Sequence, residues 1–483
     1  MKLLIPTLFC LSSLLFADSA KPNVIYILAD DLGYGELGCY GQTKIKTPNI
    51  DQLSAGGMRF TRHYSGAPVC APSRGVLLTG KQLSKAFVRN NREHKPEGQA
   101  PIPEAGITLA KIFKDQGYAT GAFGKWGLGY PGSSSDPKAL SFDTFYGYNC
   151  QRVAHSFYPP HMWSNDEKII INEKPVPGHW KKAVGPDFDF SQFYAKNYAP
   201  DLILEQALKF ISDNKDKPFF AYVPFVEPHL AMHPPHSWVD FYPKEWDQPK
   251  KSYNANYLPH LRPRAGYAAM ISDLDEHVGS IMSLLKELKL DEKTLVIFSS
   301  DNGASHCIEV DHKFFNSNKG LRGLKGSVYE GGLRVPMIAH WPKKIKAGQV
   351  SSHVSGFVDV MATMCELLNS DVPESSDGVS FLPELLGGKQ KPQPVLAWEF
   401  QGYGGQQAII LDGRWKGVRQ NLLPRGKKKT SRVPQWELYD LNKDSFEKND
   451  LAKQMPEMVD RIHKAMMANR NESEKFHMPL ASQ

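Results

Sequence analysis

The sequence predicts an α/β fold in which helices cover both faces of a mostly parallel central sheet, followed by a small antiparallel sheet near the C-terminus. Two observations predict the larger part. Short apolar runs alternate with amphipathic helical patterns through most of the 483 residues, and acidic or amide residues directly follow two of these runs. Strand, helix and strand in series favour parallel strands that are joined by helices. A third observation predicts the smaller sheet, because short strand-like runs in the tail are separated by Gly, Asp and Lys.

The elements of the main domain follow one another in regular alternation. Residues 23–28 predict a buried strand, and a helix begins at Thr47-Pro48, with Thr as N-cap and Pro in the first turn. The later elements are predicted as helices at 108–116, 201–211, 265–288 and 357–368, and strands at 118–123, 219–223 and 294–299.

The remainder of the chain predicts a change of architecture. Residues 373–388 are interpreted as a connecting loop. Four strands are then expected at 395–400, 407–411, 415–419 and 437–441, with a closing helix at 455–467. The predicted boundaries are therefore 21–372 for the main domain and 389–475 for the C-terminal subdomain. Lys427-Lys428-Lys429 is interpreted as part of a solvated hairpin loop.

The N-terminus predicts export. Lys2 precedes an apolar stretch that ends near Phe16, and small residues follow as far as Ala20. This is the form of a secretory signal peptide over residues 1–20, and it is too short to span a bilayer. We therefore expect a periplasmic or extracellular protein without stable membrane insertion.

Charge and cysteine content exclude little on their own. The net charge of +7 suits a polyanionic partner, but drift in surface charge explains it equally well, and we expect no nucleic-acid partner. Apart from Cys10 and Cys70, the cysteines match no zinc-binding spacing, and export permits a disulfide, so their state stays open: they are Cys39, Cys150, Cys307 and Cys365.

Polar residues at two strand ends indicate a metal site. Asp30-Asp31 follows the first predicted strand, and Asp301-Asn302 follows the strand at 294–299. Ligands collect at the carboxyl ends of strands in parallel sheets. Three carboxylates gathered there would repel one another without a cation, and oxygen ligands favour Ca²⁺ or Mg²⁺ over zinc. Each pair is a weak signal alone, because Asp and Asn are common turn residues.

The most specific pattern is Cys70-x-Pro72-x-Arg74, which continues into Leu77-Leu78-Thr79-Gly80-Lys81. A buried or disulfide-bonded cysteine beside a turn proline is the alternative interpretation of the cysteine alone. The extended match resembles the type I sulfatases of the alkaline phosphatase superfamily, in which this cysteine is oxidised to formylglycine. The resemblance covers residues from about 22 to about 451.

That resemblance implies a chemistry. A serine or cysteine that attacked a sulfate ester would stay sulfated, whereas a hydrated aldehyde carries two hydroxyls, of which one attacks sulfur and the other expels the sulfate. It also implies a calcium ion held by Asp30, Asp31, Cys70, Asp301 and Asn302. The further positions that match catalytic residues of the family are Arg74, Lys125 in Gly-Lys-Trp, His229 after Glu227-Pro228, and Lys325 upstream of Tyr329-Glu330-Gly331-Gly332.

The chain departs from the family at one position. Sulfatases commonly have Gly-Lys-Trp-His, and that His assists release of sulfate, but Gly127 stands here instead. His155 is the best substitute, because it lies in an Ala-His-x-x-Tyr-Pro run similar to one found in some bacterial sulfatases. A structural or substrate-contacting role for His155 is the alternative.

The sequence therefore predicts a calcium-dependent sulfatase that depends on a formylglycine-generating maturase. An exported basic protein with aromatic loops favours a sulfated carbohydrate substrate, such as an algal galactan or a host glycosaminoglycan. Two alternatives stay open: a phosphatase or phosphodiesterase of the same superfamily, and a non-catalytic binder of sulfated glycans in which Cys70 is unconverted.

Overall fold

The structure is a computed structural model that describes residues 21–103, 106–248, 250–253, 256–307, 309–423 and 435–478. The predicted signal peptide and the Lys427-Lys428-Lys429 loop lie outside these residues.

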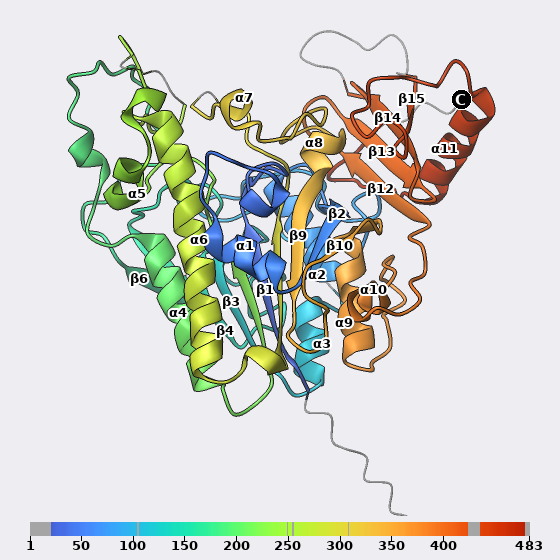
Figure 1. Ribbon diagram of the computed structural model, residues 1–483, viewed down its shortest axis with the longest axis horizontal. Coiled ribbons are helices and arrows are strands. Elements are labelled where there is room, and N and C mark those ends of the chain that lie inside the picture. Colours follow the sequence, from blue (N-terminus) through green and yellow to red (C-terminus); the bar gives the residue numbers. More distant parts are fainter. Residues whose placement is uncertain are drawn as a thin grey trace, which may run out of the picture.

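The central layer is a large mixed sheet (Figure 1). Its strands follow the order β10-β2-β9-β8-β1-β7-β3-β4-β5-β6, and β11 pairs with β2. The strand bounds are β1 Asn23–Ala29, β2 Met58–Tyr64, β3 Ala119–Lys125, β4 Thr144–Tyr148, β5 His161–Ser164, β6 Glu167–Ile170, β7 Phe219–Pro224, β8 Thr294–Ser300, β9 Arg334–His340, β10 Gln349–Ser351 and β11 Ser355–Gly356. The central strands β8, β1, β7, β3 and β4 are parallel, whereas β9, β5 and β6 pair antiparallel with their neighbours.

Helices pack on both faces of this sheet, as predicted (Figure 1). The α-helices are α1 Pro48–Ala55, α2 Cys70–Thr79, α3 Leu109–Asp115, α4 Ala199–Asp213, α5 His236–Phe241, α6 Pro263–Glu287, α7 His312–Phe315, α8 Glu330–Leu333, α9 Val358–Leu367, α10 Leu382–Leu386 and α11 Pro456–Ala468. The short 3₁₀ helices are Gly38–Tyr40, Val153–His155, Phe190–Phe193, Lys244–Trp246 and Asp291–Lys293.

The alternation of side chains along β1 separates two hydrophobic cores. Tyr26 and Leu28 pack in the core that includes α2, α3 and α9, whereas Ile25 and Ile27 pack in the core that includes α1, α4 and α6. Successive side chains of a strand point to opposite faces, so a strand covered on both faces is apolar throughout. All seven residues of β1 are buried.

The C-terminal region forms the predicted antiparallel sheet, in the order β12-β13-β14-β15. Its strands are β12 Val395–Phe400, β13 Gln406–Leu411, β14 Trp415–Gln420 and β15 Glu437–Asp440, and α11 packs on one face (Figure 1). The ammonium of Lys416 on β14 lies 2.8 Å from Glu330 of the main domain and 2.9 Å from Glu447 of the C-terminal subdomain, all three being buried. A buried charge needs such partners.

One expectation is wrong. The segment 373–388 is not a continuous loop, because α10 forms within it. Pro383 lies in the first turn, where its missing N–H costs nothing, and Gly387 ends the helix with φ 74°. The buried side chains of Leu382 and Leu385 pack in the same core as α9, which stabilises a helix too short to persist alone.

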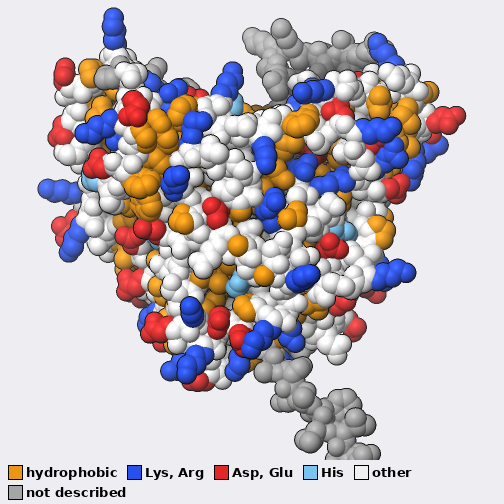
Figure 2. All heavy atoms as spheres, viewed as in Figure 1, with side chains coloured by type: hydrophobic (Ala, Val, Ile, Leu, Met, Phe, Trp, Pro, Cys, Tyr) orange, Lys and Arg blue, Asp and Glu red, His pale blue; other side chains and the backbone are white. Residues whose placement is uncertain are grey.

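The surface and the cysteines add three facts. Lys and Arg side chains are scattered among Asp and Glu on the face in Figure 2. Within the described part of the chain, no helix has the length and apolar character needed to cross a bilayer. The four cysteines whose state the sequence left open are free thiols.

Candidate active site

Strand ends bring the predicted acidic residues together. Backbone hydrogen bonds continue past the strands, with the Asp301 N–H donating to the Ala29 carbonyl and the Asp30 N–H to the Glu227 carbonyl, both at 3.0 Å. These bonds place the segments after β1, β7 and β8 side by side. Asp31 has φ 68°, and its N–H donates to Asp301 Oδ1 at 3.1 Å. Asp is one of the few residues besides glycine that adopts this left-handed conformation readily.

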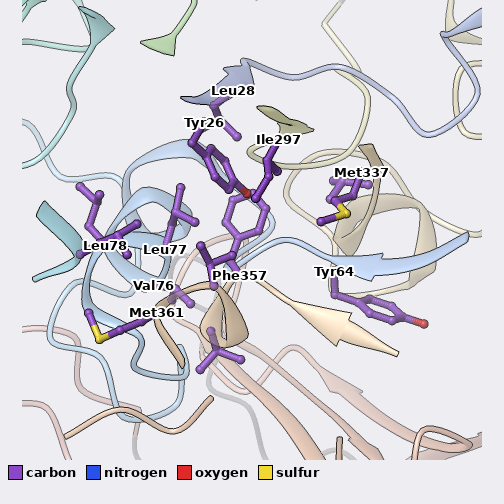
Figure 3. Packing of buried hydrophobic residues seen from close by; sticks show 14 of the residues in the cluster. Tyr26, Leu28, Tyr64, Val76, Leu77, Leu78, Ile297, Met337, Phe357 and Met361 are labelled. Atoms are coloured by element: carbon purple, nitrogen blue, oxygen red, sulfur yellow. The ribbon is translucent and has the colours of Figure 1, made fainter. Parts of the chain in front are cut away.

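Cys70 joins this group as the first residue of α2. Its sulfur and one carboxylate oxygen each of Asp30 and Asp301 lie within 4.8 Å of one another. Every residue of α2 is buried. Val76 and Leu77 anchor the helix in the core beside Tyr26 and Phe357 (Figure 3).

Burial also determines the state of the thiol. Cys70 is 2% exposed, and this burial raises the pKa of its thiol even though Lys125 and Lys325 lower it. The thiolate is the nucleophilic form of cysteine. Unmodified Cys70 is therefore poorly suited to nucleophilic attack.

Asn91 is a site residue that sequence analysis missed. Its side-chain oxygen accepts a hydrogen bond from the Ala71 N–H at 3.1 Å, and its amide nitrogen lies 3.5 Å from Cys70 Sγ. Asn91 thereby satisfies one of the free donors in the first turn of α2. The loop that carries it has no sequence signal, because Asn is common in loops.

Three cations contact the acidic group. Lys125, the last residue of β3, contacts Asp30 Oδ2. Arg74 donates from Nε and Nη2 to Asp301 Oδ2 at 3.1 and 2.9 Å and also lies 3.2 Å from Asp30. The Lys325 ammonium lies 2.6 Å from Asp31 Oδ2.

The charges shift the pKa values of two carboxyls in opposite directions. Burial raises the pKa of Asp301 to about 7, and the neighbouring charge of Asp30 adds to this rise. Burial also raises the pKa of Asp30, but the charges of Lys125 and Arg74 outweigh it and hold that pKa well below its usual range. Opposite charges favour the ionised carboxylate.

The donor set fits a hard cation. Asp30 Oδ1 and Asn302 Oδ1 are buried without a hydrogen-bond partner among the described residues. A buried polar atom without a partner is costly. Both atoms are oxygens of the predicted calcium ligands, and Asn302 is held by donating to Asp31 Oδ1 at 2.8 Å. The all-oxygen set, with residue 70 beside it, suits Ca²⁺ or Mg²⁺.

Two predicted histidines lie beside one another at this site. His229 Nε2 lies 3.7 Å from Asp31 Oδ2, and its ring stacks on that of His155 with centroids 4.9 Å apart. Tyr257 contacts both rings. Burial, together with the positive charges of Lys125 and Lys325, holds the pKa of each histidine well below its usual value. Both imidazoles are therefore neutral at neutral pH.

The side chain of Gln151 lies beside Gly127, and the substitution of His155 for the usual histidine stays a prediction. A Cβ on Gly127 would lie 2.9 Å from Gln151 Nε2, so the Gln151 side chain occupies that position. Gly127 has φ 82°, which glycine adopts without strain. Sequence analysis missed Gln151, because only the tertiary structure brings it to Gly127.

Aromatic residues from different parts of the chain line the approach to Lys325. Tyr403, from the turn between β12 and β13, packs over Gly326, where an added Cβ would lie 2.8 Å from its ring. The Tyr403 ring lies 6.1 Å from that of His306, and half of Tyr403 is exposed. Burial lowers the pKa of His306 and raises the pKa of Tyr403, and the charges of Lys325 and Asp31 also act on both groups.

Comparison with protein-family models identifies this arrangement. The model described as "Sulfatase" matches residues 22–370. The chain belongs to the sulfatase family. The model for the C-terminal part of N-sulphoglucosamine sulphohydrolase also matches this sulfatase, over residues 323–472. It is a sulfuric ester hydrolase, and members of its family in general use formylglycine and a divalent metal ion.

Curated relatives agree with this assignment. The sulfatase is 30% identical to the N-acetylgalactosamine-6-O-sulfatase of Bacteroides thetaiotaomicron, over 92% of this chain and 92% of that protein. It is 32% identical to human arylsulfatase A, over 79% of this chain and 71% of that protein.

Solved structures share the fold. The crystal structure of Ps i-CgsB in complex with k-i-k-neocarrahexaose superposes with a TM-score of 0.76 and 25% identity, over 95% of each chain. The phosphonate monoester hydrolase of Agrobacterium radiobacter has a TM-score of 0.62 and 20% identity, covering 96% of this chain and all of that one, which shows the common fold alone. The predicted fold class is thus confirmed.

Proposed function

We propose that this sulfatase removes sulfate from a sulfated carbohydrate, with formylglycine at residue 70 and one calcium ion. The observation that carries the proposal is the position of Cys70, at the start of a buried helix and within reach of Asp30 and Asp301. Formylglycine supplies a hydrated aldehyde as nucleophile. The calcium ion would be held by Asp30, Asp31, Asp301, Asn302 and residue 70.

The remaining residues bind and orient the sulfate. Lys125, Lys325 and Arg74 are already held by carboxylates, so their charges need little reorganisation when a sulfate ester binds. Asn91 donates toward residue 70 and keeps that side chain in place.

Protonation of the leaving alcohol falls to His229 or Lys325. Although burial lowers it, the charge of Asp31 raises the pKa of Lys325 well above its usual value, which keeps the ammonium protonated. His229 Nδ1 donates to the Leu230 carbonyl, so Nε2 of the neutral ring is an acceptor, and His229 can act as the acid only after Nε2 has taken up a proton.

Three features support a carbohydrate as the substrate. Tyr257, His306 and Tyr403 present aromatic surfaces near Lys325, and rings of this kind pack against the apolar faces of sugars. The relative from Bacteroides thetaiotaomicron is named for a sulfated amino sugar, and the solved structure of Ps i-CgsB holds a carrageenan oligosaccharide. The predicted signal peptide would deliver the enzyme to the periplasm or exterior, where such polymers occur, and a formylglycine-generating maturase is the expected partner.

The decisive experiment measures both the mass of the Cys70 peptide and the rate of sulfate ester hydrolysis. The mass of the Cys70 peptide is measured by mass spectrometry after expression with a maturase. Formylglycine is lighter than cysteine, and the hydrate is one water heavier than formylglycine. Converted protein should hydrolyse 4-nitrophenyl sulfate and release sulfate from N-acetylgalactosamine 6-sulfate or a carrageenan oligosaccharide. Phosphate esters turned over faster than sulfate esters would favour the phosphatase alternative, and tight glycan binding by unconverted protein without turnover would favour the binder.

A further inference from the structure

We infer that His179 is a positioning residue that holds His155 in one tautomer, so that His155 Nε2 accepts a hydrogen bond from a hydroxyl of the sugar that carries the sulfate. This inference rests on the proposed carbohydrate substrate. It assigns a function to His179, and it chooses between the two roles that the sequence left open for His155.

The hydrogen bonds determine the tautomers. His179 Nδ1 lies 2.8 Å from the Asn256 carbonyl oxygen, which can only accept, so Nδ1 of His179 carries a proton. In a neutral His179, Nε2 is then an acceptor. His155 Nδ1 lies 2.7 Å from that atom and must be the donor. Because His155 is itself neutral, its Nε2 keeps a free lone pair.

The chain is built to bring these two histidines together. Gly178 packs so closely on His155 that an added Cβ would lie 2.4 Å from the His155 carbonyl oxygen and 2.7 Å from its Cβ. His179 pairs with Tyr257 in an isolated β-bridge, and their rings stack with centroids 4.7 Å apart. The packing of Gly178 on His155 and of Tyr257 on His179 therefore fixes the positions of the two rings.

The position of His155 favours substrate recognition over attack chemistry. His155 stacks flat on His229, one of the two residues proposed to act on the leaving alcohol, and Gln151 lies beside Gly127. Nε2 of His155 has no hydrogen-bond partner among the residues that the structure describes. An acceptor nitrogen next to the leaving oxygen suits a neighbouring sugar hydroxyl, which an aryl sulfate lacks.

The test compares His179→Leu, which removes the acceptor, with His179→Gln, whose side-chain oxygen can still accept from His155. His463→Gln is the matched control, because His463 lies on α11 in the C-terminal subdomain. Each fully converted protein is assayed at pH 8 with 4-nitrophenyl sulfate. The second substrate is whichever of N-acetylgalactosamine 6-sulfate and a carrageenan oligosaccharide the wild type hydrolyses faster.

We expect His179→Leu to raise KM for the saccharide roughly three- to tenfold, the effect of one hydrogen bond, with kcat nearly unchanged. Both constants for 4-nitrophenyl sulfate should stay within about twofold of wild type. His179→Gln should restore most of the saccharide KM. Equal losses of kcat on both substrates would show that His155 and His179 act in the chemical step. Unchanged kcat and KM on both substrates would show that His179 has no role in substrate binding. Either result overturns the inference.

A spectroscopic readout is independent of turnover. Histidine ¹⁵N shifts should show His155 protonated at Nδ1 in the wild type and a change of tautomer in His179→Leu, with recovery in His179→Gln. A wild-type His155 protonated at Nε2 would overturn the inference. If the wild type hydrolyses only the aryl sulfate, the carbohydrate proposal fails, and the ¹⁵N shifts still decide the tautomer.

Discussion

The side-chain amide of Gln151 takes the place that a side chain on Gly127 would need. Gln151 Nε2 lies 2.9 Å from the position of a Cβ on Gly127 and is buried without a hydrogen-bond partner among the described residues. Histidine at position 127 would also have to adopt φ 82°. The local backbone and the Gln151 side chain therefore both favour glycine at position 127. Substitution of Gly127 by histidine alone would not fit this backbone.

Gly127→Ala should destabilise the protein. The left-handed backbone costs an alanine about 1–2 kcal/mol, and contact with Gln151 adds to this loss. Chemical unfolding of Gly127→Ala, Gln151→Ala and the double variant would separate the two contributions. If the double variant is as stable as Gln151→Ala, the backbone at 127 is not strained.

Cys70→Ala and Cys70→Ser should both lose turnover by orders of magnitude while folding normally. Serine has a single hydroxyl, so it could react once at best and could not regenerate itself. Steady-state assays report the loss, and melting curves confirm the fold. Repeated turnover by purified Cys70→Ser would contradict the formylglycine mechanism.

One calcium ion per chain should bind to converted protein. Binding should raise the free energy of unfolding, by about 2.7 kcal/mol when free calcium is one hundred times Kd. Elemental analysis, and melting curves with and without chelator, would measure stoichiometry and effect. Asp301→Asn should weaken binding, whereas Asp412→Asn, at an exposed carboxylate paired with Arg461, should not. Bound zinc, or calcium retained fully by Asp301→Asn, would refute the assignment.

The buried His277 should make stability depend on pH. Although burial lowers it, the neighbouring carboxylates of Asp201 and Glu227 raise the pKa of His277 from 6.5 to about 10. The folded state therefore binds this proton more tightly than the unfolded state. The resulting stabilisation is complete below pH 6.5 and is lost as the pH rises toward 10.

Unfolding of His277→Gln and wild type across this range tests the effect. The difference in free energy should be on the order of 2 kcal/mol below pH 6.5, and it should shrink as the pH rises. A difference that is constant from pH 6 to 10 would show that the imidazole is not charged in the folded protein.

Tyr403→Ala should weaken binding of a sulfated saccharide. Loss of about 1 kcal/mol of apolar contact corresponds to a KM roughly fivefold higher. Tyr403→Phe keeps the ring and should stay close to wild type, which separates stacking from a hydrogen bond of the hydroxyl. If both variants lose equally, the hydroxyl is the group that matters.

Sequence patterns predicted the features that are local. Apolar runs such as 23–28 and 294–299 are strands, and the acidic pairs after them meet because parallel strands share an edge. The pairing of His155 with His179, by contrast, joins residues 24 positions apart through a bridge to Tyr257. Contacts of this kind depend on how loops pack, and no periodicity in the chain encodes them.

Strands with weak patterns were also not predicted. β2, Met58–Tyr64, has alternate side chains only partly buried and contains Arg59 and Arg62, so its sequence favours no buried strand. It forms because β9 and β10 pair with it on either side. The short strands β5 and β6 depend in the same way on their neighbours.

The complete burial of α2 determines when Cys70 can be modified relative to folding. Once this helix has packed, an enzyme the size of a maturase has no route to Cys70, and opening one would mean dismantling the core around Val76 and Leu77. If Cys70 is oxidised by a maturase, as we propose, oxidation and folding compete in time, and a chain that folds first would keep its structure and stay inactive. The active fraction of a preparation would then depend on how soon the maturase acts on the unfolded chain.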